Sequence, residues 1–336
     1  MYKILSSIPR QMDNHKDKLT WIDEVCKEHK PHLLVTPQEF FGGIMMPKKP
    51  FFTFDELYPK LKRIIKKHNV ALVVGVVERE NNWNKEVVWF INEKAEFLGK
   101  VAKFALPRYD HINTNGVGDI EPETDFNNRF QIFEFFDGLR VSAIFCWEAY
   151  SDLLWTGLGI MKPDVIFSMI KFGVNSWPQV EKKDGKACVK GFGYGTWSEN
   201  GRWVERLHMA NKWQVKCPII CTTNSWNLRP ISMPLCGCIS NIDGQANHTF
   251  YHPKKEDKLK TIPEKIIVDE IDPNKVRGAL MNKFVYKDAV GHFPPYDLAK
   301  YTMMLKINRI EARLLSGREE KDVNKKKAKR KGGLGL

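Results

Sequence analysis

The sequence has 336 residues, of which 43% are hydrophobic and 28% are charged, and its formal net charge is +13. This composition is typical of an ordinary globular protein that buries a sizeable core, and the apolar runs are too short to cross a bilayer. The amino terminus lacks the apolar segment of a secretory signal, and the seven cysteines are an odd number. We therefore expect free thiols, a cytoplasmic location and no association with a membrane.

The basic charge is concentrated towards the carboxyl terminus. Residues 318–336 contain eight Lys or Arg against three Asp or Glu, and they end in a glycine-rich stretch. This composition predicts a solvated, disordered tail without a specific partner. The alternative interpretation is electrostatic binding of nucleic acid or another acidic surface, which the rest of the sequence does not require.

Apolar periodicity and turn residues predict strands that alternate with helices. In chain order, we expect strands at 3–7, 32–36, 70–77 (interrupted by Gly75), 86–91, 95–103, 130–136, 139–145, 165–169, 219–223, 235–242 and 265–270, and helices at 18–29, 55–68, 150–161, about 197–216 and from Asp272 onward. This order indicates an α/β layered domain with a mixed sheet or paired sheets. No linker divides residues 1–300, so we predict one domain, a helical extension at 301–317 and the tail at 318–336.

Three residues with useful chemistry stand at or just after the ends of predicted strands: Glu39, Lys103 and Cys146. A cysteine between a buried strand and a helix lies at the rim of a sheet. There a helix N-terminus can stabilise a thiolate and aim backbone N–H groups at an oxyanion. Aromatic neighbours would desolvate Glu39 and raise its pKa.

Each of these residues also has an ordinary structural interpretation. Glu39 could be a solvated loop charge, and Lys103 could be an exposed lysine on a sheet edge rather than an inward one with a partner. Cys146 could simply pack in the core, as free cysteines commonly do. For Glu148, two residues after Cys146, we prefer a helix-capping role over a role in the pocket.

The ordered set resembles a known family. Glu39 in LLVTPQEFF, Lys103 in GKVAKFALP and Cys146 in VSAIFCWE resemble the Glu-Lys-Cys triad of the nitrilase superfamily of carbon–nitrogen hydrolases. Four later segments also resemble that family: Lys162–Trp177, Arg206–Asn224, Cys236–Gln245 and Ile267–Val276. The resemblance covers approximately residues 1–300. It implies a four-layer αββα sandwich and subunits that pair into a homodimer or larger assembly.

The resemblance also implies roles for individual residues. Cys146 would attack an amide, nitrile or carbamoyl substrate as a thiolate, and Glu39 would accept its proton and later activate water. Lys103 would stabilise the oxyanion together with a backbone N–H near Trp147. Asn175 and Trp177 are candidates for the lining of the substrate cleft, although a core position is the ordinary interpretation for a tryptophan.

The sequence departs from the family in two respects. Ala102 precedes the lysine, where the family often has arginine or tyrosine. Many members carry a further glutamate in the loop after the lysine, and four residues are candidates for such a loop partner: Asp110, His111, Glu121 and Glu123. Cys-Trp-Glu at 146–148, with the glycine-containing loop before it, looks more like the nitrile-converting branch than the amidase branch.

The sequence thus predicts a thiol hydrolase of non-peptide carbon–nitrogen bonds that uses no cofactor and no metal. Cys236 and Cys238 lie on one face of a predicted strand, which suits core packing, and the other cysteines do not complete the usual zinc spacings. The alternative from another functional class is an inactive scaffold that binds nucleic acid or another partner through its basic surface and tail. Only the enzyme interpretation needs a reactive thiol at Cys146.

Overall fold

The protein is described by a computed structural model. It covers residues 1–43, 46, 48–80, 83–104, 120, 122–171, 174–175, 180–183, 186–189, 207, 210–224, 232–233, 236–240, 247–251 and 264–281. The predicted domain limit at residue 300, the extension at 301–317 and the tail at 318–336 lie outside the described residues. The described parts of the chain form two six-stranded sheets, two short strand pairs and the helices that cover the sheets.

The first sheet is built mainly from the amino-terminal part of the chain, and its strand order is β16-β1-β2-β3-β4-β5. Its strands are β1 (Tyr2–Ile8), β2 (Leu33–Val35), β3 (Ala71–Glu80), β4 (Trp83–Ile91), β5 (Phe97–Ala102) and β16 (Lys265–Ile271). Strands β1, β2 and β3 are parallel, whereas β16, β4 and β5 pair antiparallel. The late strand β16 therefore closes the edge beside β1.

The second sheet has the order β15-β14-β12-β8-β7-β6. Its strands are β6 (Phe133–Phe135), β7 (Leu139–Phe145), β8 (Val165–Ile170), β12 (Ile219–Thr223), β14 (Cys236–Ser240) and β15 (Asn247–Tyr251). The central strands β7, β8 and β12 are parallel. Two short pairs lie outside the large sheets: β9 (Val174–Asn175) with β13 (Ser232–Met233), and β10 (Val180–Lys183) with β11 (Lys186–Val189).

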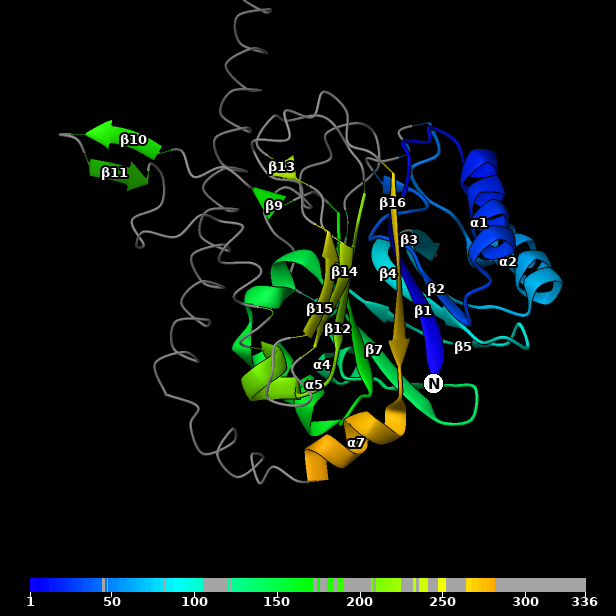
Figure 1. The fold of residues 1–336 in the computed structure, drawn as a ribbon. Helices are drawn as coiled ribbons and strands as arrows, with labels where there is room; N and C mark the ends of the chain where they lie inside the picture. The colour runs from blue at the N-terminus through cyan, green and yellow to red at the C-terminus, as the bar shows by residue number, and fades with distance from the viewer. Residues whose placement is uncertain are drawn as a thin grey trace, which may run out of the picture.

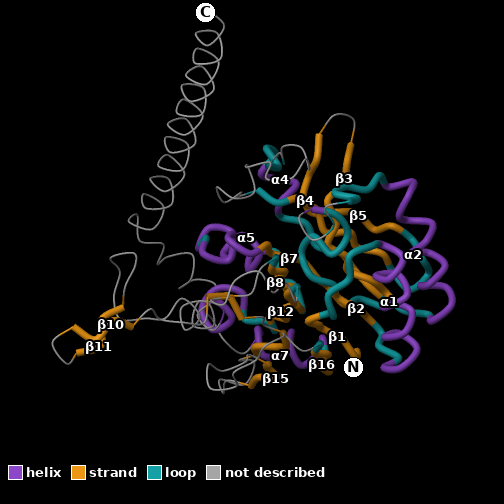
Figure 2. Tube along the Cα trace, turned by 90° about the horizontal axis from the view of Figure 1, so that it is seen from above, coloured by secondary structure: helices purple, strands orange, loops and turns teal. Residues whose placement is uncertain are grey.

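Helices cover the outer faces of the two sheets, so the layers follow the order helix, sheet, sheet, helix (Figure 1). Helices α1 (His15–His29) and α2 (Phe54–His68) pack on the first sheet. The second sheet is accompanied by α5 (Asp152–Ile160), a π-helical segment (Ala210–Val215) and α7 (Pro273–Met281), whereas the short helix α4 (Phe126–Arg129) lies against β5 of the first sheet. In the view from above, α1 and α2 lie on one side of the strands and α5 lies on the other (Figure 2). This is the predicted αββα sandwich.

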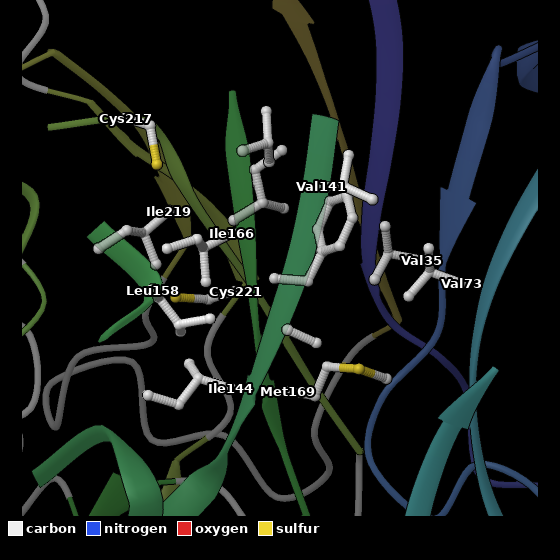
Figure 3. Close-up of a cluster of buried hydrophobic side chains, with 14 of the residues drawn as sticks. Val35, Val73, Val141, Ile144, Leu158, Ile166, Met169, Cys217, Ile219 and Cys221 are labelled. Carbon is white, nitrogen blue, oxygen red and sulfur yellow. The ribbon is translucent and has the colours of Figure 1, made fainter. Parts of the chain in front are cut away.

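Alternation along the strands explains this layering, because successive side chains of a strand point to opposite faces. In the first sheet, Val35 and Val73 join the core between the sheets, whereas Leu34 and Leu72 pack towards α1 and α2. Figure 3 shows Val35 and Val73 approaching the second sheet, with Leu158 of α5 on the opposite side. Both faces of each sheet are therefore buried.

Most predicted elements are present, with four corrections. Strand β3 continues through Gly75, which pairs with Val88. The chain after residue 145 first makes a 3₁₀ turn, Cys146–Tyr150, and α5 begins only at Asp152. Strand β6 is shorter than predicted, because the chain at 130–132 is not yet paired. Only part of the helix expected at 197–216 is described, and residues 210–215 of it are π-helical.

Candidate active site

The candidate site lies where the parallel strands of both sheets end. Two side chains at the end of β12 join the sheets there: Thr222 Oγ1 donates to the Ser7 carbonyl at 2.8 Å, and Asn224 Nδ2 donates to the Gln38 carbonyl at 2.6 Å. The Asn224 contact reaches the backbone directly before Glu39. These buried cross-sheet bonds hold the segment after β2 against the end of the second sheet.

Glu39 is held in an unusual conformation. Its φ is +52°, in the left-handed region that is uncommon for a residue other than glycine, and its side chain is 1% exposed. A side chain added at Gly43 would place its Cβ 2.0 Å from Glu39 Oε2, so the carboxylate lies directly against the Gly43 backbone. Gly75 allows the segment before Glu39 to approach β3 closely, because a Cβ added at Gly75 would lie 2.1 Å from the Pro37 carbonyl oxygen.

Four buried charged side chains make a chain of contacts in which the sign of the charge alternates. Lys171 Nζ lies 2.5 Å from Glu39 Oε1 and 3.2 Å from Glu86 Oε1, and Lys103 Nζ lies 2.9 Å from Glu86 Oε2. None of the four side chains is more than 4% exposed. We call Glu39, Lys171, Glu86 and Lys103 the charged quartet. Of the two interpretations of Lys103, the structure shows the inward one, with Glu86 as a partner.

The electrostatics of the quartet favour the ionised form of Glu86. Burial by itself raises the pKa of Glu86. The charges of Lys103 and Lys171 and a hydrogen bond with the Glu39 carboxyl lower it by more than burial raises it, so the pKa lies well below its usual range. Gln38 Nε2 also donates to Glu86 Oε2. Buried charges are tolerated when they are paired and hydrogen-bonded in this way. The predicted desolvation of Glu39 is present, and it comes with a cation, Lys171, that the sequence analysis did not foresee.

Cys146 differs from the other cysteines whose side chains the structure describes. It is partly exposed, whereas Cys26, Cys217, Cys221, Cys236 and Cys238 are buried. Burial raises the pKa of each of those five thiols, to about 12 for Cys26 and for Cys236. Cys146 directly follows β7, with φ +21° at the start of the 3₁₀ turn. A strained backbone at a strand end suits a thiol that must be accessible for chemistry.

Glu148 links the segments that carry Lys103 and Cys146. Its carboxylate accepts from the backbone N–H of Phe104 at 2.7 Å and from that of Phe145 at 3.1 Å. The buried Arg129 guanidinium donates to the same carboxylate at 2.6 Å and 3.1 Å. Glu148 therefore satisfies the backbone at the start of the turn, as the capping role predicts. It also fixes the residue after Lys103 against the residue before Cys146.

Another buried lysine, Lys18, supports the segment of Glu39 from the side of helix α1. Lys18 of α1 is 3% exposed, and its Nζ donates to the Phe40 carbonyl at 2.6 Å. Burial lowers the pKa of Lys18 to about 7, although the negative charges of Glu39 and Asp13 oppose this decrease. Lys18 thus places a titratable cation behind the left-handed turn at Glu39.

Several predicted site residues are not placed by the described structure. Trp177, Asp110, His111 and Glu121 lie outside the described residues, and only the backbone is described for Trp147 and Asn175. Asn175 belongs to β9 and pairs with Ser232 of β13. Glu123, the fourth candidate loop partner, is described: its N–H donates to the Lys103 carbonyl at 2.8 Å, and its carboxylate lies 3.6 Å from Lys85 Nζ.

Sequence reasoning missed Glu86 and Lys171. Glu86 shares its strand face with Val88 and Phe90, which belong to the core between the sheets, so alternation along β4 was a usable signal. Lys171 follows the wholly buried strand β8, in the same way as Glu39 follows β2. Glu86, which contacts Lys103, comes from the strand before it, whereas the loop partner was sought after Lys103, where Asp110, His111 and Glu121 lie outside the described residues.

The comparison with protein families matches the carbon–nitrogen hydrolase model to residues 12–183. The match spans just over half of the chain and includes Glu39, Lys103 and Cys146. The chain belongs to the carbon–nitrogen hydrolase family. This membership makes the protein a hydrolase of non-peptide carbon–nitrogen bonds. A search of curated protein sequences gave no match.

Solved structures of nitrilase-superfamily proteins share the fold of this hydrolase. Nit3 from Saccharomyces cerevisiae has a TM-score of 0.58 at 12% identity, over 84% of this chain and 94% of that chain. A carbon-nitrogen hydrolase from Helicobacter pylori G27 has a TM-score of 0.61 at 12% identity, over 85% and 97%. A mutant amidase from Nesterenkonia sp. AN1, with acrylamide added to its active-site cysteine, has a TM-score of 0.55 at 12% identity, over 84% and 99%. These similarities confirm the predicted fold class.

Two further observations concern metal sites and membrane-spanning helices. Among the residues that the structure describes, no three His, Cys, Asp or Glu side chains gather as a metal site would require. Within the same residues, no helix has the length and apolar character needed to cross a membrane.

Proposed function

We propose that this hydrolase cleaves an amide, nitrile or carbamoyl compound through a covalent intermediate on Cys146, with Glu39 and Lys103 as the other members of a catalytic triad. The observation that carries the proposal is the site itself. A partly exposed thiol stands on a strained strand end, at the edge where buried Glu39 and Lys103 belong to one charged quartet.

The first half-reaction requires a nucleophile, a proton acceptor and a cation. The Cys146 sulfur attacks the substrate carbon, and Glu39 takes the thiol proton. For an amide, the carbonyl electrons move to oxygen, and Lys103 stabilises this oxyanion together with backbone N–H donors of the turn after Cys146. The carbon–nitrogen bond then breaks, and the proton held by Glu39 leaves with the nitrogen as ammonia or an amine.

The second half-reaction releases the acyl group. Glu39, now deprotonated, takes a proton from water as the water attacks the thioester. The carbon–sulfur bond breaks, the thiolate recovers the proton from Glu39, and the product leaves as a carboxylic acid. A nitrile follows the same course through a thioimidate, and its first water addition releases ammonia before the thioester is hydrolysed. The burial of Glu39 and Lys103 strengthens these electrostatic steps, because water screens them little.

The chemistry of the amidase from Nesterenkonia sp. AN1 suggests suitable probes. Solved structures of that protein describe Michael addition of acrylamide, and covalent addition of the acetamide moiety of fluoroacetamide, at its active-site cysteine. We propose that Cys146 takes part in the same reactions. This extends a property of that amidase to the only partly exposed thiol among the described cysteine side chains.

The test is intact-protein mass spectrometry after incubation with small amides, nitriles and carbamoyl compounds, with acrylamide and fluoroacetamide as reactive probes. We expect an adduct on the wild type that Cys146→Ala abolishes, and its mass identifies the acyl group. Cys26→Ala is the matched control, because that thiol is buried and burial raises its pKa to about 12. Its adducts should equal those of the wild type.

A positive result also requires turnover. Ammonia release from the same compounds should follow adduct formation and should fall at least about a hundredfold in Glu39→Gln, because a positioned general base contributes about 10²–10⁴ in rate. If no compound modifies the protein and a general thiol reagent also spares Cys146, the proposed mechanism is wrong.

A further inference from the structure

We propose that Lys171 is a positioning residue of the candidate site, which fixes the Glu39 carboxylate, and that Glu86 is the shared counterion that keeps Lys171 and Lys103 charged side by side. This inference rests on the proposed function, since it concerns the same thiol. It adds two residues, Glu86 and Lys171, to the three that the sequence motif supplies.

The contacts of Lys171 support the first part. Its ammonium lies 2.5 Å from Glu39 Oε1 and 3.2 Å from Glu86 Oε1, and the residue is 3% exposed. A buried ammonium with two carboxylates in reach restrains both carboxylates strongly. The other side of Glu39 is closed by the Gly43 backbone. Glu39 is therefore held between the Lys171 ammonium and the Gly43 backbone.

The topology places this restraint next to the candidate nucleophile. Strands β7 and β8 are parallel neighbours, and Phe145 pairs with Met169. Cys146 is the next residue after Phe145, and Lys171 comes two residues after Met169. In this register Cys146 is level with residue 170, one position before Lys171, and adjacent strands lie about 4.8 Å apart. The charge of Lys171 therefore lies at the same end of the sheet as the Cys146 thiol.

Glu86 supplies the second part of the inference. One of its carboxylate oxygens faces Lys171 and the other faces Lys103, so a single negative charge is shared between two ammonium groups. Without it, two like charges would be buried together at high electrostatic cost. The quartet alternates two lysines with two glutamates, so each member has a neighbour of the opposite charge type.

The test is the pH dependence of Cys146 alkylation by iodoacetamide, followed by peptide mass spectrometry so that each thiol is read separately. Removal of the cation in Lys171→Met should destabilise the thiolate and move the midpoint of the profile up by about one pH unit. Removal of the anion in Glu86→Gln should move it down by a similar amount. In the double variant the two shifts should largely cancel.

Two controls separate an electrostatic role from a merely structural one. Lys171→Arg keeps the charge and should retain a midpoint close to that of the wild type. Lys100→Met removes a lysine of β5 that also pairs with two glutamates, Glu78 and Glu80. This lysine lies away from the quartet, because Glu78 of β3 accepts from Trp89, which belongs to the helix-facing core. The variant should leave the midpoint unchanged. Thermal unfolding of each variant reports whether it folds.

The outcomes are distinct. Opposite shifts in the single variants with cancellation in the double variant support the inference. Midpoints that do not move, or that move in the same direction, overturn it. Because alkylation needs no turnover, an enzyme that hydrolyses amides with unshifted profiles would refute only the role of Lys171 and Glu86. Shifted profiles in a protein that forms no acyl adduct would refute only the proposed function. If Lys171→Met does not fold, the shift of Glu86→Gln still decides.

Discussion

Arg129 and Glu148 form an ion pair with an N–O distance of 2.6 Å, and neither side chain has any exposed surface. Through this pair the short helix α4 supports the carboxylate that accepts from the backbone at Phe104 and at Phe145. Lys103 and Cys146, 43 positions apart in the sequence, are therefore fixed by one side chain at the adjoining residues.

Arg129→Met should be strongly destabilising, because it leaves the Glu148 carboxylate buried without its guanidinium partner. We expect a loss of about 3–5 kcal/mol in the free energy of unfolding, as for other broken buried pairs. Urea denaturation measures this loss. The double variant Arg129→Met with Glu148→Gln removes both charges and should be more stable than Arg129→Met alone. A double variant that is less stable than the single one would contradict this account.

Gly43→Ala should impair the site while the fold survives. The new methyl group would meet Glu39 Oε2 at 2.0 Å, and Gly43 also has φ +61°, where a side chain is strained. The carboxylate must shift, so we expect acylation of Cys146 to slow by about a hundredfold, as for other misplacements near 1 Å. Gly278→Ala is the matched control, since nothing lies within 4 Å of its new Cβ. Equal acylation rates in both variants would show that Gly43 does not position Glu39.

Asp269 should make the fold less stable as the pH rises. Its side chain is 5% exposed, and burial raises its pKa from 3.8 to about 7. The folded state therefore binds this proton more tightly than the unfolded state. The associated stability is complete below pH 4 and is lost progressively up to about pH 7. Asp269→Asn should gain roughly 1–4 kcal/mol over the wild type between pH 4 and pH 8 in urea unfolding. A constant difference across this range would exclude the effect.

Lys18 should produce the opposite dependence. Burial lowers its pKa from 10.5 to about 7, so the unfolded chain binds this proton more tightly than the folded protein. The stability that depends on Lys18 is present above pH 10.5 and is lost as the pH falls through 7. In Lys18→Met the unfolding free energy should change less between pH 7 and pH 10 than in the wild type. Lys16→Met, on the same helix and with an exposed side chain, serves as the comparison.

The predictable part of the site consists of residues at the ends of regular elements. Glu39 and Cys146 follow short apolar runs, and such runs predict buried strands whose ends point to a common edge. The left-handed backbone at both residues could not be foreseen, because neither is a glycine. It results from tertiary contacts, such as the packing of Glu39 on Gly43. Local sequence therefore located these residues but did not give their conformation.

The partners of these residues required the three-dimensional structure. Lys171 and Glu86 are 85 positions apart and come from different sheets, and the register of each strand decides that they meet. The burial of Lys18 could not be predicted from the sequence either, since a lysine in a surface helix normally points to solvent. Its contact with the Phe40 carbonyl depends on how α1 lies against the segment after β2. No periodicity within one element contains that information.

The pairing of β1 with β16 has a consequence for the order in which the molecule is assembled. All seven residues of β1 align with β16, from Tyr2 with Ile271 to Ile8 with Lys265. During synthesis, β1 leaves the ribosome long before β16, so its outer edge stays unpaired until residues 265–271 have been made. Such distant pairing slows folding, and an unpaired strand edge invites association with other chains. Nascent chains that end before residue 265 therefore keep an unpaired β1 edge that can associate with other chains.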